Sequence, residues 1–156
     1  MTNLIGEYEC KVDAKGRLLI PSALRKQFSA QAEGQLFVKR GIELCLEIYQ
    51  KHDWERVSHQ VASLNQFVKK NRVFARKFIS GVTQMELDSV GRILLPKSML
   101  DYAGVSRELV LFCYGDKIEV WSKERYDDEL DMTADDFSDL AEDVMGDAKP
   151  RADELS

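Results

Sequence analysis

The stretch DAKGRLLIP at residues 13–21 is repeated as DSVGRILLP at residues 88–96, an offset of 75 residues with five of nine positions identical. The match extends backwards to a glycine in each copy and forwards to the segments EIY at residues 47–49 and EVW at residues 119–121. Because self-similarity at a fixed separation is typical of a duplicated structural unit, we expect one ancestral unit to occur twice in this chain.

Each copy is expected to form the same short strands. Apolar and polar side chains alternate over residues 7–12, which indicates a strand with one buried face. The D-x-x-G step that follows predicts a hairpin turn, since Asp accepts backbone N–H bonds at its first position and Gly adopts a positive φ at its fourth without steric cost. Pro21 and Pro96 are expected to begin short helices. The expected strands are residues 7–12, 17–20, 35–39 and 44–49 in the first copy and 82–87, 92–95, 108–114 and 117–122 in the second.

Two further segments have helical patterns. Between the copies, a first apolar stripe with spacings of three and four indicates a helix, and the same pattern resumes over residues 71–80. The first stripe consists of Trp54, Val57, Val61, Leu64 and Val68. After residue 126, apolar residues are interspersed with nine acids from Asp127 to Asp143, and Thr133 is expected to cap a short amphipathic helix. The residues from Lys149 onward are predicted to be disordered.

The domain organisation follows from the size of the repeat. A unit of four short strands has too little core to fold alone, so the two copies are expected to complete one barrel related by a pseudo-twofold axis. The predicted fold class is α+β, an internally duplicated β-barrel with short helices and a helical insert between its halves. The expected segments are a first unit at residues 1–50, the insert at 51–80, a second unit at 81–126 and an acidic tail, partly helical or disordered, at 127–156.

Charge is unevenly distributed along the chain, whose formal net charge is -5. Residues 1–126 contain 20 Lys and Arg against 15 Asp and Glu, whereas residues 127–156 contain 2 against 12. A basic body favours a polyanionic partner, and an acidic tail favours solubility or self-screening. The insert has no acid between Arg56 and Met85; its cations could be a solvated helix face, a nucleic-acid contact or a contact for a neighbour's acidic tail.

Several classes of protein are disfavoured. The longest apolar run has six residues, 109–114, far fewer than the roughly 20 of a membrane helix, and the N-terminal residues lack a basic region typical of a signal sequence. Three widely spaced cysteines predict reduced thiols and a cytoplasmic protein. Two histidines seven apart, and the lack of P-loop, G-x-S-x-G or dinucleotide patterns, predict no enzyme, cofactor, metal or small-molecule ligand.

The candidate binding residues lie at the repeated turns. Arg17 and Arg92 follow the turns directly, and a planar guanidinium suits phosphate oxygens and guanine edges. Each Asp could instead pair with its own Arg merely to hold the turn, but duplication favours binding. Lys15 adds a cation where the second turn has Val90, so the first turn is expected to bind anions more strongly. The turn residues are Asp13, Gly16, Asp88 and Gly91, and Arg25 and Lys97 are second-rank candidates.

Residues 13–21 and 88–96, separated by this insert, resemble the MraZ family of bacterial transcriptional regulators, which is related to the AbrB-type swapped-hairpin DNA-binding fold. Residues 6–9 and 41–49, followed by Trp54, are also similar to that family. The resemblance covers about residues 4–126 and places the acidic extension after Tyr126 outside the family core.

The resemblance implies a swapped-hairpin barrel whose DNA surface lies at the D-x-x-x-R loops, here Lys15 and Arg17 first and Arg92 next. It implies binding of double-stranded DNA at repeated boxes upstream of the division and cell-wall gene cluster, including the protein's own operon. It further implies a nucleoid-associated location and closed rings of many copies, octamer-like. A ring-forming scaffold for protein interactions, without specific DNA binding, is the alternative hypothesis.

Overall fold

The computed structural model describes residues 2–30 and 33–146, which divide between Tyr126 and Asp127 into two compact units. The strands are β1 (Leu4–Lys11), β2 (Arg17–Leu19), β3 (Gln35–Arg40), β4 (Leu46–Gln50), β5 (Thr83–Glu86), β6 (Arg92–Leu94), β7 (Glu108–Gly115) and β8 (Lys117–Ser122). The helices are α1 (Ser22–Arg25), α2 (Lys51–Ala62), α3 (Lys69–Ile79), α4 (Lys97–Ala103), α5 (Lys123–Leu130) and α6 (Ala134–Gly146). Among these described helices, none has the length and apolar character needed to cross a membrane.

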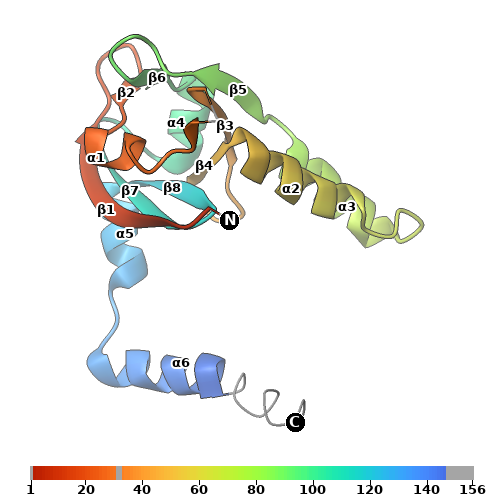
Figure 1. The fold of residues 1–156 in the computed structure, drawn as a ribbon. Coiled ribbons are helices and arrows are strands. Elements are labelled where there is room, and N and C mark those ends of the chain that lie inside the picture. Colours follow the sequence, from red (N-terminus) through yellow and green to blue (C-terminus); the bar gives the residue numbers. More distant parts are fainter. Residues whose placement is uncertain (1, 31–32, 147–156) are drawn as a thin grey trace. The chain divides into compact units, whose positions relative to one another are not determined.

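The strand pairing confirms the duplicated, swapped-hairpin α+β fold. A six-stranded sheet has the order β1-β7-β8-β4-β3-β5, and β2 pairs with β6 in a separate two-stranded ribbon. If β1 to β4 are exchanged for β5 to β8, every pairing maps onto another pairing or onto itself: β1·β7 becomes β5·β3, and β2·β6 and β4·β8 are unchanged. Figure 1 shows β2 and β6 together at one end of the barrel. The two copies are therefore related by a pseudo-twofold axis through β2·β6 and β4·β8.

The turn at residues 13–16 does not connect two strands that pair with each other, as the hairpin predicted from its sequence would. Val12, which follows β1, forms one isolated bridge to Leu18 of β2, whereas β1 itself pairs along its whole length with β7. β2 has only three residues, too few to satisfy the eight-residue edge of β1. Exchange between the copies gives β1 a partner of equal length, the eight-residue β7, so the backbone groups of β1 are paired.

One hydrophobic core serves both copies. Leu18 and Ile93 face each other across the ribbon, and both are buried. The core also contains residues on either side of the two prolines: Ile20, Leu24, Leu95, Met99, Leu100 and Ala103. The helix after Pro96, α4, is capped at its C-terminus by Gly104 in the left-handed conformation (φ 71°), which favours glycine. Neither copy can bury this apolar surface without the other.

The helical insert differs from the single stripe that its spacing predicts. The chain leaves helical structure between α2 and α3, so Leu64 and Val68 lie outside both helices. Asn65 causes the break, because its side chain accepts the backbone N–H of Phe67 at 3.0 Å and its backbone carbonyl accepts the side-chain amide of Asn71 at 3.0 Å. Such side-chain hydrogen bonds offer the backbone a local alternative to helical bonding. The helices form an antiparallel pair instead (Figure 1), in which Phe78 stacks on Trp54 with ring centroids 6.3 Å apart.

The compact unit that begins at Asp127 contains the predicted capped helix. The hydroxyl of Thr133 accepts the N–H of Asp136 at 3.1 Å, and its carbonyl accepts the N–H of Phe137 at 3.0 Å. The first of these bonds satisfies one of the otherwise unpaired amides of α6, and the second is the first regular hydrogen bond of the helix. The predicted disorder from Lys149 onward concerns residues outside the described part of the chain.

Candidate nucleic-acid interface

The β2·β6 ribbon brings the two motif arginines onto one surface. Its register pairs Arg17 with Leu94 and Leu19 with Arg92. Because side chains alternate along a strand, the central pair faces the core, while these four residues face outward. Arg17 and Arg92 are diagonal neighbours on that outer face, which places their Cα atoms about 7–8 Å apart. This outer face and the two turns beside it form the candidate interface.

The same hydrogen bonds build both turns. Asp13 Oδ1 accepts the backbone N–H groups of Lys15 and Arg17, each at 2.9 Å. Asp88 Oδ1 accepts those of Val90 and Arg92 at 3.0 and 2.8 Å. Gly16 and Gly91 have φ of 86° and 91°, a region that favours glycine. The duplication therefore extends to individual atoms of the turn.

Each aspartate also holds the guanidinium of its own arginine. Arg17 Nε donates to Asp13 Oδ2 at 2.6 Å, and Arg92 Nε donates to Asp88 Oδ2 at 2.7 Å. The pKa of each carboxyl is lowered, first by the backbone N–H of the arginine and also by its guanidinium. Both aspartates lie at the solvent-exposed turns, so these ion pairs orient side chains rather than add much stability.

The terminal nitrogens of both arginines remain available. Within the described residues, the Nη atoms of Arg17 and Arg92 form no hydrogen bond, and each side chain is 36% exposed. The Nε bond to Asp uses one edge of the planar fork and leaves the Nη edge for another acceptor. The pair that holds the turn is thus also able to orient a binding group, so the structural and binding interpretations of the motif are compatible.

The structure adds a cation beside the second turn. Arg25 is half-buried, and its Nε donates to the carbonyl of Ile20 at 3.0 Å. Its guanidinium lies against the backbone of Gly91, where a Cβ would be 2.6 Å from Arg25 Cζ. The residue equivalent to Arg25 is Leu100, which lies beside Gly16 instead. The first turn therefore has Lys15 beside it and the second has Arg25, and stronger anion binding by the first turn stays a prediction.

Other cations surround the first turn. Lys97 is exposed and forms an ion pair with Asp101 at 3.0 Å, which reduces its attraction for an anion. Lys15 and Lys97 line the same shallow pocket beside Gly16. Lys11 and Arg107 line a second pocket at the turn, and sequence reasoning missed them. Arg107 reaches the turn because its carbonyl accepts the N–H of Val12 at 2.9 Å, a contact that no local sequence signal indicates.

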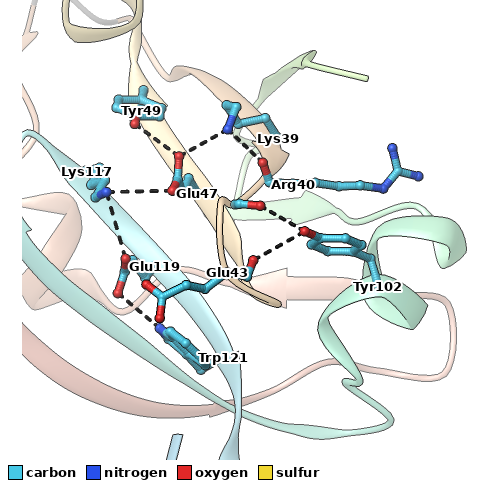
Figure 2. A network of polar contacts seen from close by, with 10 residues as sticks. Lys39, Arg40, Glu43, Glu47, Tyr49, Tyr102, Lys117, Glu119 and Trp121 are labelled. Atoms are coloured by element: carbon cyan, nitrogen blue, oxygen red, sulfur yellow. Dashed lines mark hydrogen bonds and ion pairs between the residues drawn. The ribbon is translucent and has the colours of Figure 1, made fainter. Parts of the chain in front are cut away.

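At the β4·β8 pairing lies a buried polar network (Figure 2). Glu47 is opposite Glu119 in the register. Lys39 Nζ lies 3.2 Å from Glu47 Oε1, and Lys117 Nζ lies 3.6 Å from Glu47 and 3.9 Å from Glu119. Burial lowers the pKa of Lys39. Two carboxylates and two ammonium groups balance here, so the network is a structural feature of the barrel; in the described residues, no cluster of His, Cys, Asp and Glu has a metal-binding arrangement.

Comparisons with known proteins match both repeats. A family model described as "MraZ protein, putative antitoxin-like" matches residues 4–77 and 78–147. Proteins named "Transcriptional regulator MraZ" from Christiangramia forsetii and Flavobacterium psychrophilum are 46% and 42% identical over 147 residues, covering 94% of this chain and 95% and 94% of theirs. The counterpart from Cytophaga hutchinsonii is 33% identical over 144 residues, covering 92% of this chain and 95% of its own.

One solved structure, the solution structure of PHS018 from Pyrococcus horikoshii, aligns with 75% of this chain and 87% of its own, with 18% identity and a TM-score of 0.31. A likeness this weak carries no argument about fold or function.

The family match corrects one expectation about the acidic tail. The second match runs through residue 147, so α5 and α6 belong to the repeat and are not an extension outside the family core. They follow β8 as α2 and α3 follow β4, and the change of charge at residue 127 hides this equivalence. Both repeats, with their turns and the helices that follow, are thus accounted for, and the chain belongs to the MraZ family.

Proposed function

We propose that this protein is a sequence-specific, DNA-binding transcriptional regulator. The observation that carries the proposal is the pair of guanidinium groups on one face of a two-stranded ribbon, each held by an identical aspartate turn. A two-stranded ribbon fits the major groove of B-DNA, and arginine is the commonest reader of guanine there. The names of the relatives, transcriptional regulators, agree with this function.

The residues of the interface divide into two roles. Arg17 and Arg92 present their Nη edges to bases, and the exposed Leu19 and Leu94 between them offer apolar contacts for thymine methyl groups. The cations beside the turns contact phosphates, which position the protein without reading sequence. These phosphate-contacting residues are Lys15, Arg25 and Lys97. The two turns differ in their added cation, so the two halves of the bound site are expected to differ in sequence.

The partners are double-stranded DNA and further copies of the chain. One ribbon offers few base contacts, so we propose that a ring of several copies, octamer-like, engages repeated boxes together and gains affinity by effective concentration. The boxes lie upstream of the division and cell-wall gene cluster, including the protein's own operon. In this proposal the protein works in the cytoplasm on the nucleoid, uses no cofactor and catalyses no reaction.

The test is gel-shift binding of the full-length protein to its own upstream DNA. Arg17→Ala and Arg92→Ala should each weaken binding, whereas Lys51→Ala, which removes an exposed cation from α2 away from the ribbon, should bind as the wild type does. A folded Arg17→Ala protein with unchanged affinity would reject this interface. Wild-type indifference to any DNA by an assembled protein would favour the alternative, a ring-forming scaffold for protein interactions.

A further inference from the structure

Helix α6 has an apolar stripe exposed among acids. Phe137, Leu140 and Val144 lie at the spacings of one helix face and are 64%, 45% and 58% exposed. Five acids share the helix, and residues 127–146 contain no Lys or Arg. A 13-residue helix is marginal in water without a packed face, and a contiguous exposed apolar patch marks a contact surface. The stripe therefore requires a partner that is apolar in the middle and basic around it.

A groove with these properties lies in the compact unit that ends at Tyr126, between α3, α4 and the β3–β4 connection. It is lined by Arg40, Ile42, Phe74, Lys77, Phe78 and Tyr102. Phe74 and Phe78 pack with centroids 5.4 Å apart, and Ile42 is 72% exposed. Figure 2 shows Arg40 directed away from the buried network, beside Tyr102. The guanidinium lies over that ring at 5.7 Å, so the groove has an apolar floor and a cationic rim.

Charge selects this groove over other apolar surfaces. The segment from residue 57 to residue 85 has cations and no acids, whereas α5, which precedes α6, carries Glu124, Asp127 and Asp128 and would repel an acidic helix. Trp121 and Tyr126, two aromatic residues that precede α6 along the chain, are already buried. Opposite charges around an apolar centre give an interface both specificity and orientation.

We propose that α6 of one copy docks in this groove of a second copy. Its stripe covers Phe74 and Ile42, and its acids face Arg40 and Lys77. The inference rests on the proposed self-association and names the surface responsible. Because the helix and the groove are two different surfaces of the chain, the contact is head-to-tail, and the same contact can repeat around a closed ring.

Two complementary variants of the full-length protein test the docking. The helix variant, Phe137→Asp with Leu140→Asp, loses the stripe and keeps the groove. The groove variant, Ile42→Asp with Lys77→Glu, loses the groove and keeps the stripe. All four side chains are exposed, so the fold should persist, as circular dichroism would verify. Lys69→Glu is the matched control, an exposed cation of α3 outside the groove lining.

Light scattering after size exclusion gives the readout. The wild type and Lys69→Glu should be multimeric, each double variant should fall to the mass of one chain, and an equimolar mixture of the two should give a dimer, since one intact groove meets one intact helix. Variants that keep the wild-type mass, a mixture no heavier than its components, or a monomeric wild type would overturn the proposal. None of these positions lies on the β2·β6 ribbon, so such results would leave DNA binding to be judged by its own test.

Discussion

The two turn glycines should differ in their tolerance of alanine. Both have a positive φ, 86° for Gly16 and 91° for Gly91, and this conformation costs a residue with a Cβ about 1–2 kcal/mol. A Cβ on Gly16 would also lie 2.7 Å from the backbone carbonyl oxygen of Leu95. That segment is fixed, because the Leu95 N–H donates to the Gly16 carbonyl at 2.9 Å, and weakening this bond costs about 1 kcal/mol more.

Gly91→Ala meets a different neighbour. The new Cβ would contact the guanidinium of Arg25, a flexible side chain that can move away. We therefore expect Gly16→Ala to lower the free energy of unfolding by about 2–3 kcal/mol and Gly91→Ala by about 1–2 kcal/mol. Gly91→Ala should nevertheless lose more DNA affinity per unit of lost stability, because it displaces a cation from the interface.

Urea denaturation followed by tryptophan fluorescence measures the first difference, at one fixed protein concentration because self-association adds to apparent stability. Gel shifts of the same two proteins measure the second. Equal losses of stability, or a larger loss for Gly91→Ala, would show that the backbone contact at Gly16 does not limit the turn as described.

Three further predictions concern the core, the turns and the thiols. Leu18→Ala should lower the free energy of unfolding by about 2–5 kcal/mol, measured by urea denaturation; a loss below 1 kcal/mol would contradict a core shared by both copies. The folded-state pKa values of Asp13 and Asp88 are lowered, so both carboxylates stabilise the folded protein above the unfolded pKa of about 3.9, and this stabilisation is lost as pH falls through the folded values. A variant with both residues changed to Asn should therefore lose less stability in an acid titration than the wild type does, and an identical titration would contradict the assignment. Burial raises the pKa of Cys45 to about 12 and that of Cys113 to about 11, so at pH 8 both should react with a thiol reagent far more slowly in the native protein than in urea, where all three cysteines react; fast native labelling of either would refute their burial.

The turns were predictable because their chemistry is local. Asp13 and Gly16 lie three residues apart, and both the carboxylate hydrogen bonds and the positive φ follow from residue type at fixed positions. The cap at Thr133 has the same character. By contrast, the exchange of strands between copies depends on the lengths of distant partners, which alternation within one segment does not encode. The residues alone predicted the duplication, whereas the exchange of strands was expected only from the resemblance to a known family.

The errors in the helices have physical causes too. Apolar spacing continues through residues 63–68, so periodicity could not detect the hydrogen bonds that Asn65 accepts, through its side chain and its carbonyl, in the break between α2 and α3. The charge change after Tyr126 suggested an added tail, although α5 and α6 repeat the positions of α2 and α3 along the chain. In a duplicated protein, apolar and structural positions persist while surface charge diverges.

The two central arginines of the site could be predicted from the sequence, whereas part of the surrounding cations could not. Arg17 and Arg92 were found from the motif, and their shared outer face follows from a two-residue period once β2 and β6 are paired. Arg25 was named only as a flanking cation, because its contact with Gly91 spans 66 residues of sequence. Arg107 was missed for the same reason, because its contact with Val12 also joins distant parts of the sequence.

The central claim is that the Nη edges of Arg17 and Arg92 read bases. The most direct test compares the wild type with a variant carrying both Arg17→Lys and Arg92→Lys, using the protein's upstream DNA and a scrambled duplex of equal length at one salt concentration. Lysine keeps the charge and loses the planar fork, so binding to the scrambled duplex should stay unchanged, while preference for the upstream sequence should fall about fivefold or more for each arginine that makes a bidentate base contact. An unchanged preference in the folded double variant would contradict the claim.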